Sequence, residues 1–223
     1  MSKFLFLTDS AANPRGFTNP SEVTHLEETY PYLIRNQYKD STFWQLSLGS
    51  VTSEQLCSQA ISYLNHWKPD IIIVQTGLAD CRPEAFTEFQ KTVITKFSGP
   101  IFDHIKKYVY HPKLIKRRQV YRVTKRSFRK TLTKFKLIFS DSKIYWLDII
   151  AGAKYEEMRP GVNKRIEDYN PIIRKIYGND FVPVAQKIIE VNGFNEDDLH
   201  WNKLGHKVVA DILHERIISD FNI

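Results

Sequence analysis

A serine near one end of the chain and a histidine near the other could together carry out nucleophilic chemistry. Ser10 follows the apolar run at residues 4–7 almost at once, so it lies where a first buried segment ends. Asp197 and His200 stand three residues apart, a spacing that lets a carboxylate reach the imidazole of the following histidine. A histidine oriented in this way can accept the proton of a serine hydroxyl. The three residues therefore predict a nucleophile, its base and an orienting carboxylate.

Each of these residues also has a plainer interpretation. Ser10 could cap a helix, which is a common role of serine. His200 could be a structural or surface histidine, and Asp198 is a rival carboxylate at a less suitable spacing. We expect Asp9 to bond backbone amides in its turn rather than to move a proton. The elements that would bring Ser10 and His200 together decide between these interpretations.

The order of strands and helices predicts how such distant residues meet. Apolar stretches suited to strands alternate along the chain with stretches suited to helices. The expected strands are residues 3–7, 42–48, 70–75, 143–150 and 180–184. The expected helices are residues 21–38, 52–67, 84–97, 162–177 and 202–219. The run DIIIVQ does not alternate apolar and polar residues, which is typical of a parallel strand covered on both faces. This pattern predicts a three-layer α/β/α sandwich with a mostly parallel, five-stranded sheet.

Three turns are expected to meet at one edge of this sheet. Ser10 lies just past the first expected strand, Gly49 just past the second and Gly77 just past the third. Because ligands of such folds bind beyond the carboxyl ends of the strands, these turns mark the expected site. The sequence has no metal-ligand spacing and no glycine-rich phosphate loop, so we expect neither a metal nor a cofactor there.

Four short blocks in this order make the chain resemble the SGNH hydrolases, also called GDSL-type esterases. The blocks are TDS at 8–10 where the family has GDS, the glycine of LSLGS, GLAD at 77–80 where the family has GxND, and the pair Asp197 and His200 in the family's DxxH. The resemblance implies a flavodoxin-like fold and acyl-ester chemistry. It implies that Ser10 attacks the acyl carbon, His200 accepts the serine proton and Asp197 orients the histidine. It also implies that the backbone amides of Ser10 and Gly49 bind the oxyanion.

One departure from the family pattern concerns this oxyanion. Ala79 occupies the place of the family asparagine, whose side-chain amide helps to bind the oxyanion. Losing one such donor can lower the rate by about 10²–10³-fold. Arg82 is the charged candidate to replace it, although it could also bind an anionic substrate group or pair with a surface acid. We count Asp80 with Arg82 as a candidate substrate-binding residue, with bracing of its loop as the alternative for Asp80.

The net charge of +7 is concentrated in one segment. Residues 104–136 contain thirteen Lys or Arg and no Asp or Glu, whereas the remainder holds more acidic than basic residues. Apolar side chains recur there at helical spacing and predict one helix face, formed by Leu114, Tyr121, Phe128, Leu132 and Phe135. We expect a basic helical insertion in a single domain that spans 1–223. Its basic face is either solvated or contacts an anionic membrane surface, an anionic glycan or a partner protein, and no recognised motif favours nucleic acid.

Composition fits one globular domain. A chain of 223 residues with 42% hydrophobic residues can bury a sizeable core, and its two cysteines argue against a disulfide framework. No stretch approaches the ~20 apolar residues that cross a bilayer, and no signal peptide is evident. We therefore expect a cytoplasmic protein, or one that is peripheral at the membrane.

Together these features predict a serine-dependent acyl-ester hydrolase or acyltransferase that forms an acyl-serine intermediate. The resemblance points to an acylated carbohydrate, for example an acetylated one in glycan biosynthesis, as its substrate. One alternative is a non-catalytic glycan-binding or membrane-docking module on a decayed hydrolase fold. Another is the same pocket rebuilt for a different group transfer.

Overall fold

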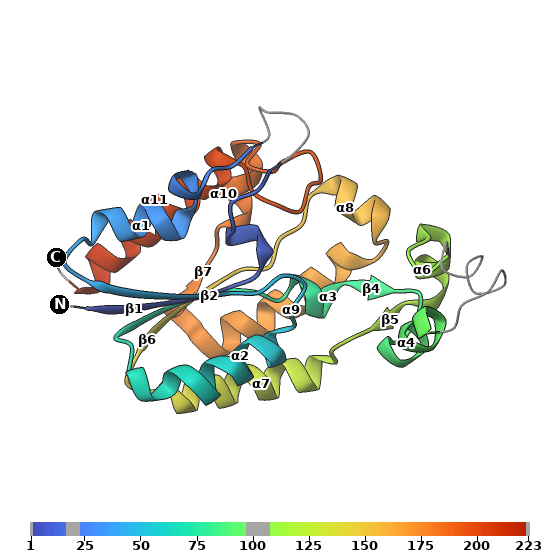
Figure 1. Ribbon diagram of the computed structural model, residues 1–223, viewed down its shortest axis with the longest axis horizontal. Helices are drawn as coiled ribbons and strands as arrows, with labels where there is room; N and C mark the ends of the chain where they lie inside the picture. Colours follow the sequence, from blue (N-terminus) through green and yellow to red (C-terminus); the bar gives the residue numbers. More distant parts are fainter. Residues whose placement is uncertain (1, 17–22, 97–107, 222–223) are drawn as a thin grey trace.

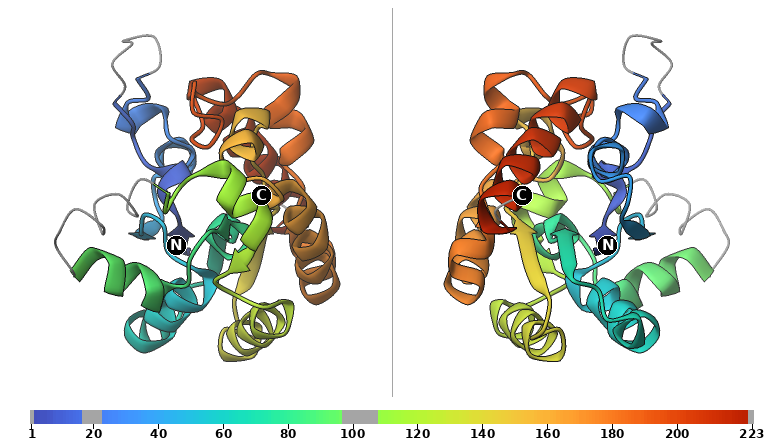
Figure 2. Two further views of the ribbon diagram at one scale, coloured as in Figure 1. Left: turned by 90° about the vertical axis from the view of Figure 1, so that its right-hand side faces the viewer. Right: turned by 90° about the vertical axis from the view of Figure 1, so that its left-hand side faces the viewer.

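A parallel sheet runs through the centre of the protein. The computed structural model describes residues 2–16, 23–96 and 108–221. The strands are β1 (Lys3–Thr8), β2 (Thr42–Ser47), β3 (Ile71–Gln75), β6 (Lys143–Leu147) and β7 (Phe181–Val182). Their order is β2-β1-β3-β6-β7, and every neighbouring pair is parallel. Helices cover both faces (Figure 1, Figure 2), which confirms the expected three-layer α/β/α sandwich with a five-stranded parallel sheet.

Two cores lie on the two faces of this sheet. One is covered by α2 (Ser53–Leu64), α7 (Lys125–Ile138) and α9 (Val162–Tyr177). The other is covered by α1 (Tyr30–Gln37), α10 (Ala185–Glu190) and α11 (Lys203–Phe221). All five residues of β3 are buried, because both of its faces lie under helices. None of the helices in the described part of the chain combines the length and the hydropathy that a membrane span needs.

A local signal in the sequence sets the start of α2. Thr52 and Gln55 form the expected capping box, since the Thr52 hydroxyl accepts the Gln55 N–H and the Gln55 side chain accepts the Thr52 N–H. Pro171 lies inside α9 without ending it. Other short helices are η1 (Ser10–Ala12), η3 (Leu26–Glu28), η4 (Asn65–Trp67), α3 (Leu78–Cys81), α8 (Ala153–Met158) and η5 (Gly178–Asp180).

The basic segment is not the single helical insertion that its apolar spacing indicates. Residues 104–107 lie outside the described residues, and the rest divides into α6 (Pro112–Arg118), β5 (Val120–Tyr121) and α7. Gln119 ends α6 because it adopts a left-handed conformation, with φ of 45°. Of the five residues of the expected apolar face, Phe128, Leu132 and Phe135 are fully buried and belong to α7. The other two, Leu114 and Tyr121, are only half-buried. The helix α7 therefore belongs to the helical layer of the sandwich, and its basic side chains are exposed on the opposite face.

A small arm projects from the sandwich beyond the carboxyl ends of the strands. It comprises residues 83–96 and 108–122, with β4 (Pro83–Glu84), α4 (Glu88–Lys96), α6 and β5. The strands β4 and β5 pair in antiparallel fashion and carry α4 and α6 away from the body (Figure 1). We refer to these residues as the arm.

The buried histidine of α11 makes the stability of the fold depend on pH. His206 is fully buried, and its Nδ1 accepts the Tyr30 N–H at 3.2 Å. Burial lowers the pKa of His206 to about 3, whereas an unfolded histidine titrates near pH 6.5. Below pH 6.5 only the unfolded state therefore takes up this proton, and the free energy of unfolding falls as the pH decreases towards 3.

A His206→Asn variant tests this dependence, because its amide oxygen can still accept the Tyr30 N–H. Between pH 7 and pH 5 we expect the wild-type protein to lose about 2 kcal/mol more unfolding free energy than the variant. Urea unfolding at the two pH values measures the difference. Equal losses in the two proteins would contradict it.

Candidate active site

Ser10, His200 and Asp197 lie in one hydrogen-bonded line beyond the carboxyl end of β1. His200 Nε2 lies 3.0 Å from Ser10 Oγ, and His200 Nδ1 lies 2.6 Å from Asp197 Oδ2. The histidine is only 4% exposed, so these contacts are largely shielded from water. The structure thus brings together residues from the two ends of the chain in the order that their chemistry requires.

The loop before α11 holds Asp197 as a carboxylate. Its Oδ1 accepts the backbone N–H of Leu199 at 3.1 Å and that of His200 at 3.0 Å. Partial burial opposes ionisation, but the hydrogen bonds from the His200 ring and from these two amides lower the pKa of Asp197 to about 2. An ionised Asp197 favours the proton on Nδ1 of His200, which leaves Nε2 free to accept the proton of Ser10.

The carboxylate of Asp198, the alternative to that of Asp197, is hydrogen-bonded to the start of α8. Its Oδ2 accepts the Lys154 N–H at 2.9 Å, at the start of α8, and its backbone carbonyl accepts the Gly152 N–H at 2.8 Å. Asp198 therefore fastens α8 to the loop that carries His200.

Asp9, and not Ser10, caps the short helix η1. Asp9 Oδ1 accepts the Ala11 N–H at 2.9 Å and the side-chain amide of Gln75 at 2.8 Å. The backbone N–H of Asp9 also donates to the Gln75 carbonyl at 2.9 Å. Burial raises the pKa of Asp9, although the hydrogen bonds from Ala11 and Gln75 oppose this shift. Asp9 accepts a hydrogen bond from the backbone of its turn, as expected, and the Ser10 hydroxyl does not cap the helix.

A small hollow of about 40 Å³ opens beside Ser10. It is lined by Asp9, Ser10, Ser50, Val51, Leu78, Ala79, Arg82, Tyr155 and Leu199. Gly49 lies in the exposed turn next to Ser50 but is not among these lining residues. Gly77 opens α3 with φ of 122°, and a Cβ there would lie 2.6 Å from the Ile149 side chain, so this turn requires glycine.

The expectation that Asp80 binds substrate needs correction. Asp80 is fully buried, and its two carboxylate oxygens accept the backbone N–H of Ser53 at 2.8 Å and the Ser53 hydroxyl at 2.7 Å. Burial raises the pKa of Asp80 to about 6, against the hydrogen bonds from Ser53. Asp80 therefore ties α3 to the first residue of α2 and braces the loops around the hollow.

Arg82 lies at the edge of the hollow and forms an ion pair with an acid of the arm. Its guanidinium donates to Glu84 Oε1 from Nε at 3.2 Å and from Nη2 at 3.0 Å. Glu84 is buried, so Arg82 pairs with an interior acid, whereas the alternative considered from the sequence was a surface acid. The Arg82 side chain is still 19% exposed, and it lines the same hollow as Ser10.

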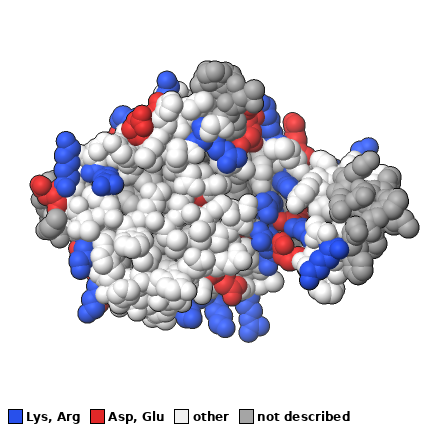
Figure 3. Space-filling model, in the orientation of Figure 1, with Lys and Arg blue, Asp and Glu red and all other residues white. Residues whose placement is uncertain are grey.

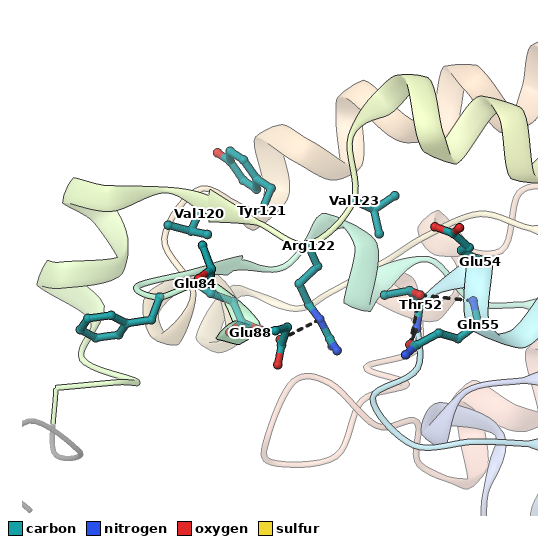
Figure 4. Close-up of a pocket in the computed structure, with 11 residues that line it drawn as sticks. Thr52, Glu54, Gln55, Glu84, Glu88, Val120, Tyr121, Arg122 and Val123 are labelled. Atoms are coloured by element: carbon teal, nitrogen blue, oxygen red, sulfur yellow. Dashed lines mark hydrogen bonds and ion pairs between the residues drawn. The ribbon is translucent and has the colours of Figure 1, made fainter. Parts of the chain in front are cut away.

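A second cavity, of about 390 Å³, lies between the arm and α2. Figure 4 shows Arg122 reaching into this cavity, with Glu88 on one side and Thr52 on the other. Arg122 Nε lies 3.1 Å from Glu88 Oε1, and its Nη1 donates to the Ser50 carbonyl at 3.1 Å. Sequence reasoning did not single out Arg122, whose only signal was its place in the basic segment. Through Ser50 it links the arm to the turn that carries Gly49.

The geometry defines the class of protein. A Ser–His–Asp line beyond the carboxyl edge of a parallel sheet is the arrangement of a serine hydrolase. The part of the chain that the structure describes contains no group of three or more His, Cys, Asp or Glu that could hold a metal ion. The sequence model of the GDSL-like lipase/acylhydrolase family matches residues 13–213. The chain therefore belongs to this family and is a GDSL-type esterase/acylhydrolase, which confirms the resemblance seen in the sequence.

Solved structures share the fold at low sequence identity. A lipase/acylhydrolase from Enterococcus faecalis superposes with a TM-score of 0.66 at 12% identity, covering 99% of this chain and 97% of its own. A catalytic mutant of the acetylxylan esterase Axe2 from Geobacillus stearothermophilus gives 0.63 at 16% identity, with coverage of 97% and 94%. The esterase EstA from Pseudoalteromonas sp. gives 0.58 at 15% identity, with both chains covered completely. A search of curated protein sequences finds no match.

Proposed function

We propose that this esterase cleaves or transfers the acyl group of an acylated carbohydrate through Ser10. The observation that carries the proposal is the 3.0 Å contact between Ser10 Oγ and His200 Nε2, in line with the 2.6 Å contact between His200 Nδ1 and Asp197. A nucleophile, its base and an orienting carboxylate within hydrogen-bond distance are what acyl transfer by serine needs.

The contacts suggest what Ser10 and His200 each do in this reaction. Ser10 Oγ attacks the acyl carbon while His200 Nε2 takes the hydroxyl proton. As the tetrahedral intermediate breaks down, His200 returns this proton to the leaving sugar oxygen, and the acyl group stays on Ser10. Water or an acceptor hydroxyl then attacks the acyl-serine, with His200 again as the base. The backbone amides of Ser10 and Gly49 hold the oxyanion in both steps.

The hollow beside Ser10 favours a short acyl group. A bound water needs roughly 15 Å³ of such space, so a hollow of about 40 Å³ suits an acetyl group better than a fatty acyl chain. The apolar part of its lining, with Leu78, Tyr155 and Leu199, suits a methyl group. Structural relatives described as acetylxylan esterases support a carbohydrate as the alcohol part of the ester.

A serine-reactive fluorophosphonate tests the proposed function directly. We expect the intact mass of the wild-type protein to rise by one adduct and that of Ser10→Ala to stay unchanged. Ser50→Ala is the matched control, because Ser50 lines the same hollow, and we expect it to be labelled. An unlabelled wild-type protein that still binds an acetylated oligosaccharide would favour a non-catalytic glycan-binding module. A labelled Ser10→Ala variant would show that another residue is the nucleophile.

A further inference from the structure

Four cations lie close together where the arm joins the body, and one of them, Arg82, lines the hollow of Ser10. They are Arg82, Lys91, Arg122 and Arg159, and we call them the cation cluster. We infer that this cluster binds an anionic group, a carboxylate or a phosphate, carried by the acylated substrate; the inference rests on the function proposed above.

The cluster adjoins the hollow through several separate elements. Arg82 lines the hollow itself, and Arg122 donates to the carbonyl of Ser50, another lining residue. Arg159 follows α8, whose Tyr155 also lines the hollow. An anion held by these side chains would therefore lie beside the acyl group that Ser10 attacks.

The cations are close enough to influence one another. Burial lowers the pKa of Lys91 to about 8, and the positive charges of Arg82, Arg122 and Arg159 add to this shift. Burial also lowers the pKa of Arg159, where the contact with Tyr155 opposes the shift and the charge of Arg82 adds to it. Bringing an anion among these groups would relieve their mutual repulsion.

Two acids pair with three of the four cations. Glu84 forms ion pairs with Arg82 and Lys91, and Glu88 forms ion pairs with Lys91 and Arg122. A third acid, Glu54, lines the cavity on the side of α2, where it accepts the Ser127 hydroxyl at 3.4 Å. Figure 3 shows acidic and basic side chains together in the notch between the arm and the body.

Arg159 is the member of the cluster that lacks a counter-ion. Within the described ranges it forms no ion pair, and its guanidinium stacks on the Tyr110 ring, 5.0 Å from the ring centre. The guanidinium also hydrogen-bonds to Tyr155, but its Nη1 is buried without a hydrogen-bond partner. A buried charged donor without a partner is costly, and a bound carboxylate or phosphate would supply the missing acceptor. The enclosed position of the cluster suits a group on a substrate better than a flat membrane surface.

Three acetyl esters that differ in one charged group test the inference. They are the O-acetylated methyl glycosides of glucose, glucuronic acid and glucose 6-phosphate, and acetate release gives kcat/KM for each. We expect the wild-type enzyme to prefer at least one acidic ester over the neutral one by ~10-fold or more, since hydrogen bonds between charged groups are worth about that factor. The preferred ester distinguishes a carboxylate from a phosphate. The preference should shrink as NaCl is added.

Variants of two arginines show whether the cluster is responsible for this preference. Arg159→Gln should lower the ratio of acidic to neutral kcat/KM by ~10-fold, and Arg159→Lys should restore part of it. Arg129→Gln removes the same charge from the exposed face of α7 and should leave the ratio unchanged. Equal kcat/KM for all three esters in the wild-type enzyme would overturn the inference, as would an unchanged ratio in folded Arg159→Gln. Turnover that survives Ser10→Ala would instead overturn the proposed function, so the two failures are distinguishable.

Discussion

Ser10→Ala and His200→Ala are each expected to lower kcat/KM for 4-nitrophenyl acetate by ~10³-fold or more. The first change removes the oxygen that we propose attacks the ester. The second removes the proposed base, whose Nε2 lies 3.0 Å from that oxygen. What activity is left would come from the oxyanion amides and from binding alone. Initial rates with purified protein measure the loss, and circular dichroism checks that the fold is kept.

The double variant sharpens this test. Because nucleophile and base act as one unit, Ser10→Ala combined with His200→Ala should lose hardly more activity than either single variant. Ser50→Ala serves again as the control inside the same hollow, with turnover close to that of the wild-type enzyme. Wild-type turnover by Ser10→Ala, or losses that multiply in the double variant, would show that the two residues do not work together.

Ala79→Asn is expected to raise kcat by ~10²-fold. Ala79 lines the hollow with Ser10, at the position where the family places a side-chain amide donor for the oxyanion. Arg82, the candidate substitute, donates instead to Glu84. An asparagine would add a donor that acts mainly on the transition state. Because removing one such donor costs about 10²–10³-fold, adding it should raise kcat more than it lowers KM.

Ala79→Asp is the matched control for this gain. Aspartate has nearly the shape of asparagine, but its carboxylate cannot donate a hydrogen bond and repels the oxyanion, so we expect no gain in kcat. Steady-state kinetics of the two variants separate the new donor from the change in size. An unchanged kcat in Ala79→Asn would mean that another donor, with Arg82 as the charged candidate in the same hollow, already completes the oxyanion site.

Much of the fold could be predicted because burial and strand order leave strong local signals. The apolar run of β3 required cover on both faces, and the capping box of Thr52 and Gln55 marked the start of α2. Parallel strands place their carboxyl ends at one edge, which is why Ser10 and the turns after β2 and β3 could be assigned to one site. The spacing of Asp197 and His200 predicted the other two residues of the Ser–His–Asp line.

The arm and its charges could not be predicted in the same way. The strands β4 and β5 are two residues long and pair across 38 positions of sequence, as with Pro83 and Tyr121. The four residues of α3 are too few to show a helical period. The sequence around Asp80 does not show that both of its carboxylate oxygens accept hydrogen bonds from Ser53. Those bonds depend on how α2 and α3 pack together. Tertiary contacts of this kind decide which charged groups face a substrate.

Asp9, and not Ser10, makes the hydrogen bond that caps the turn, and this makes a Ser10 variant suitable as a substrate trap. Because the carboxylate of Asp9 holds the turn, removing the Ser10 hydroxyl takes away no hydrogen bond of the backbone around it. A Ser10→Ala protein should therefore keep its binding surface while leaving the ester uncleaved. Immobilised on a column, it could retain its natural ester from a cell extract, and mass spectrometry of the eluate would then identify both the sugar and the acyl group.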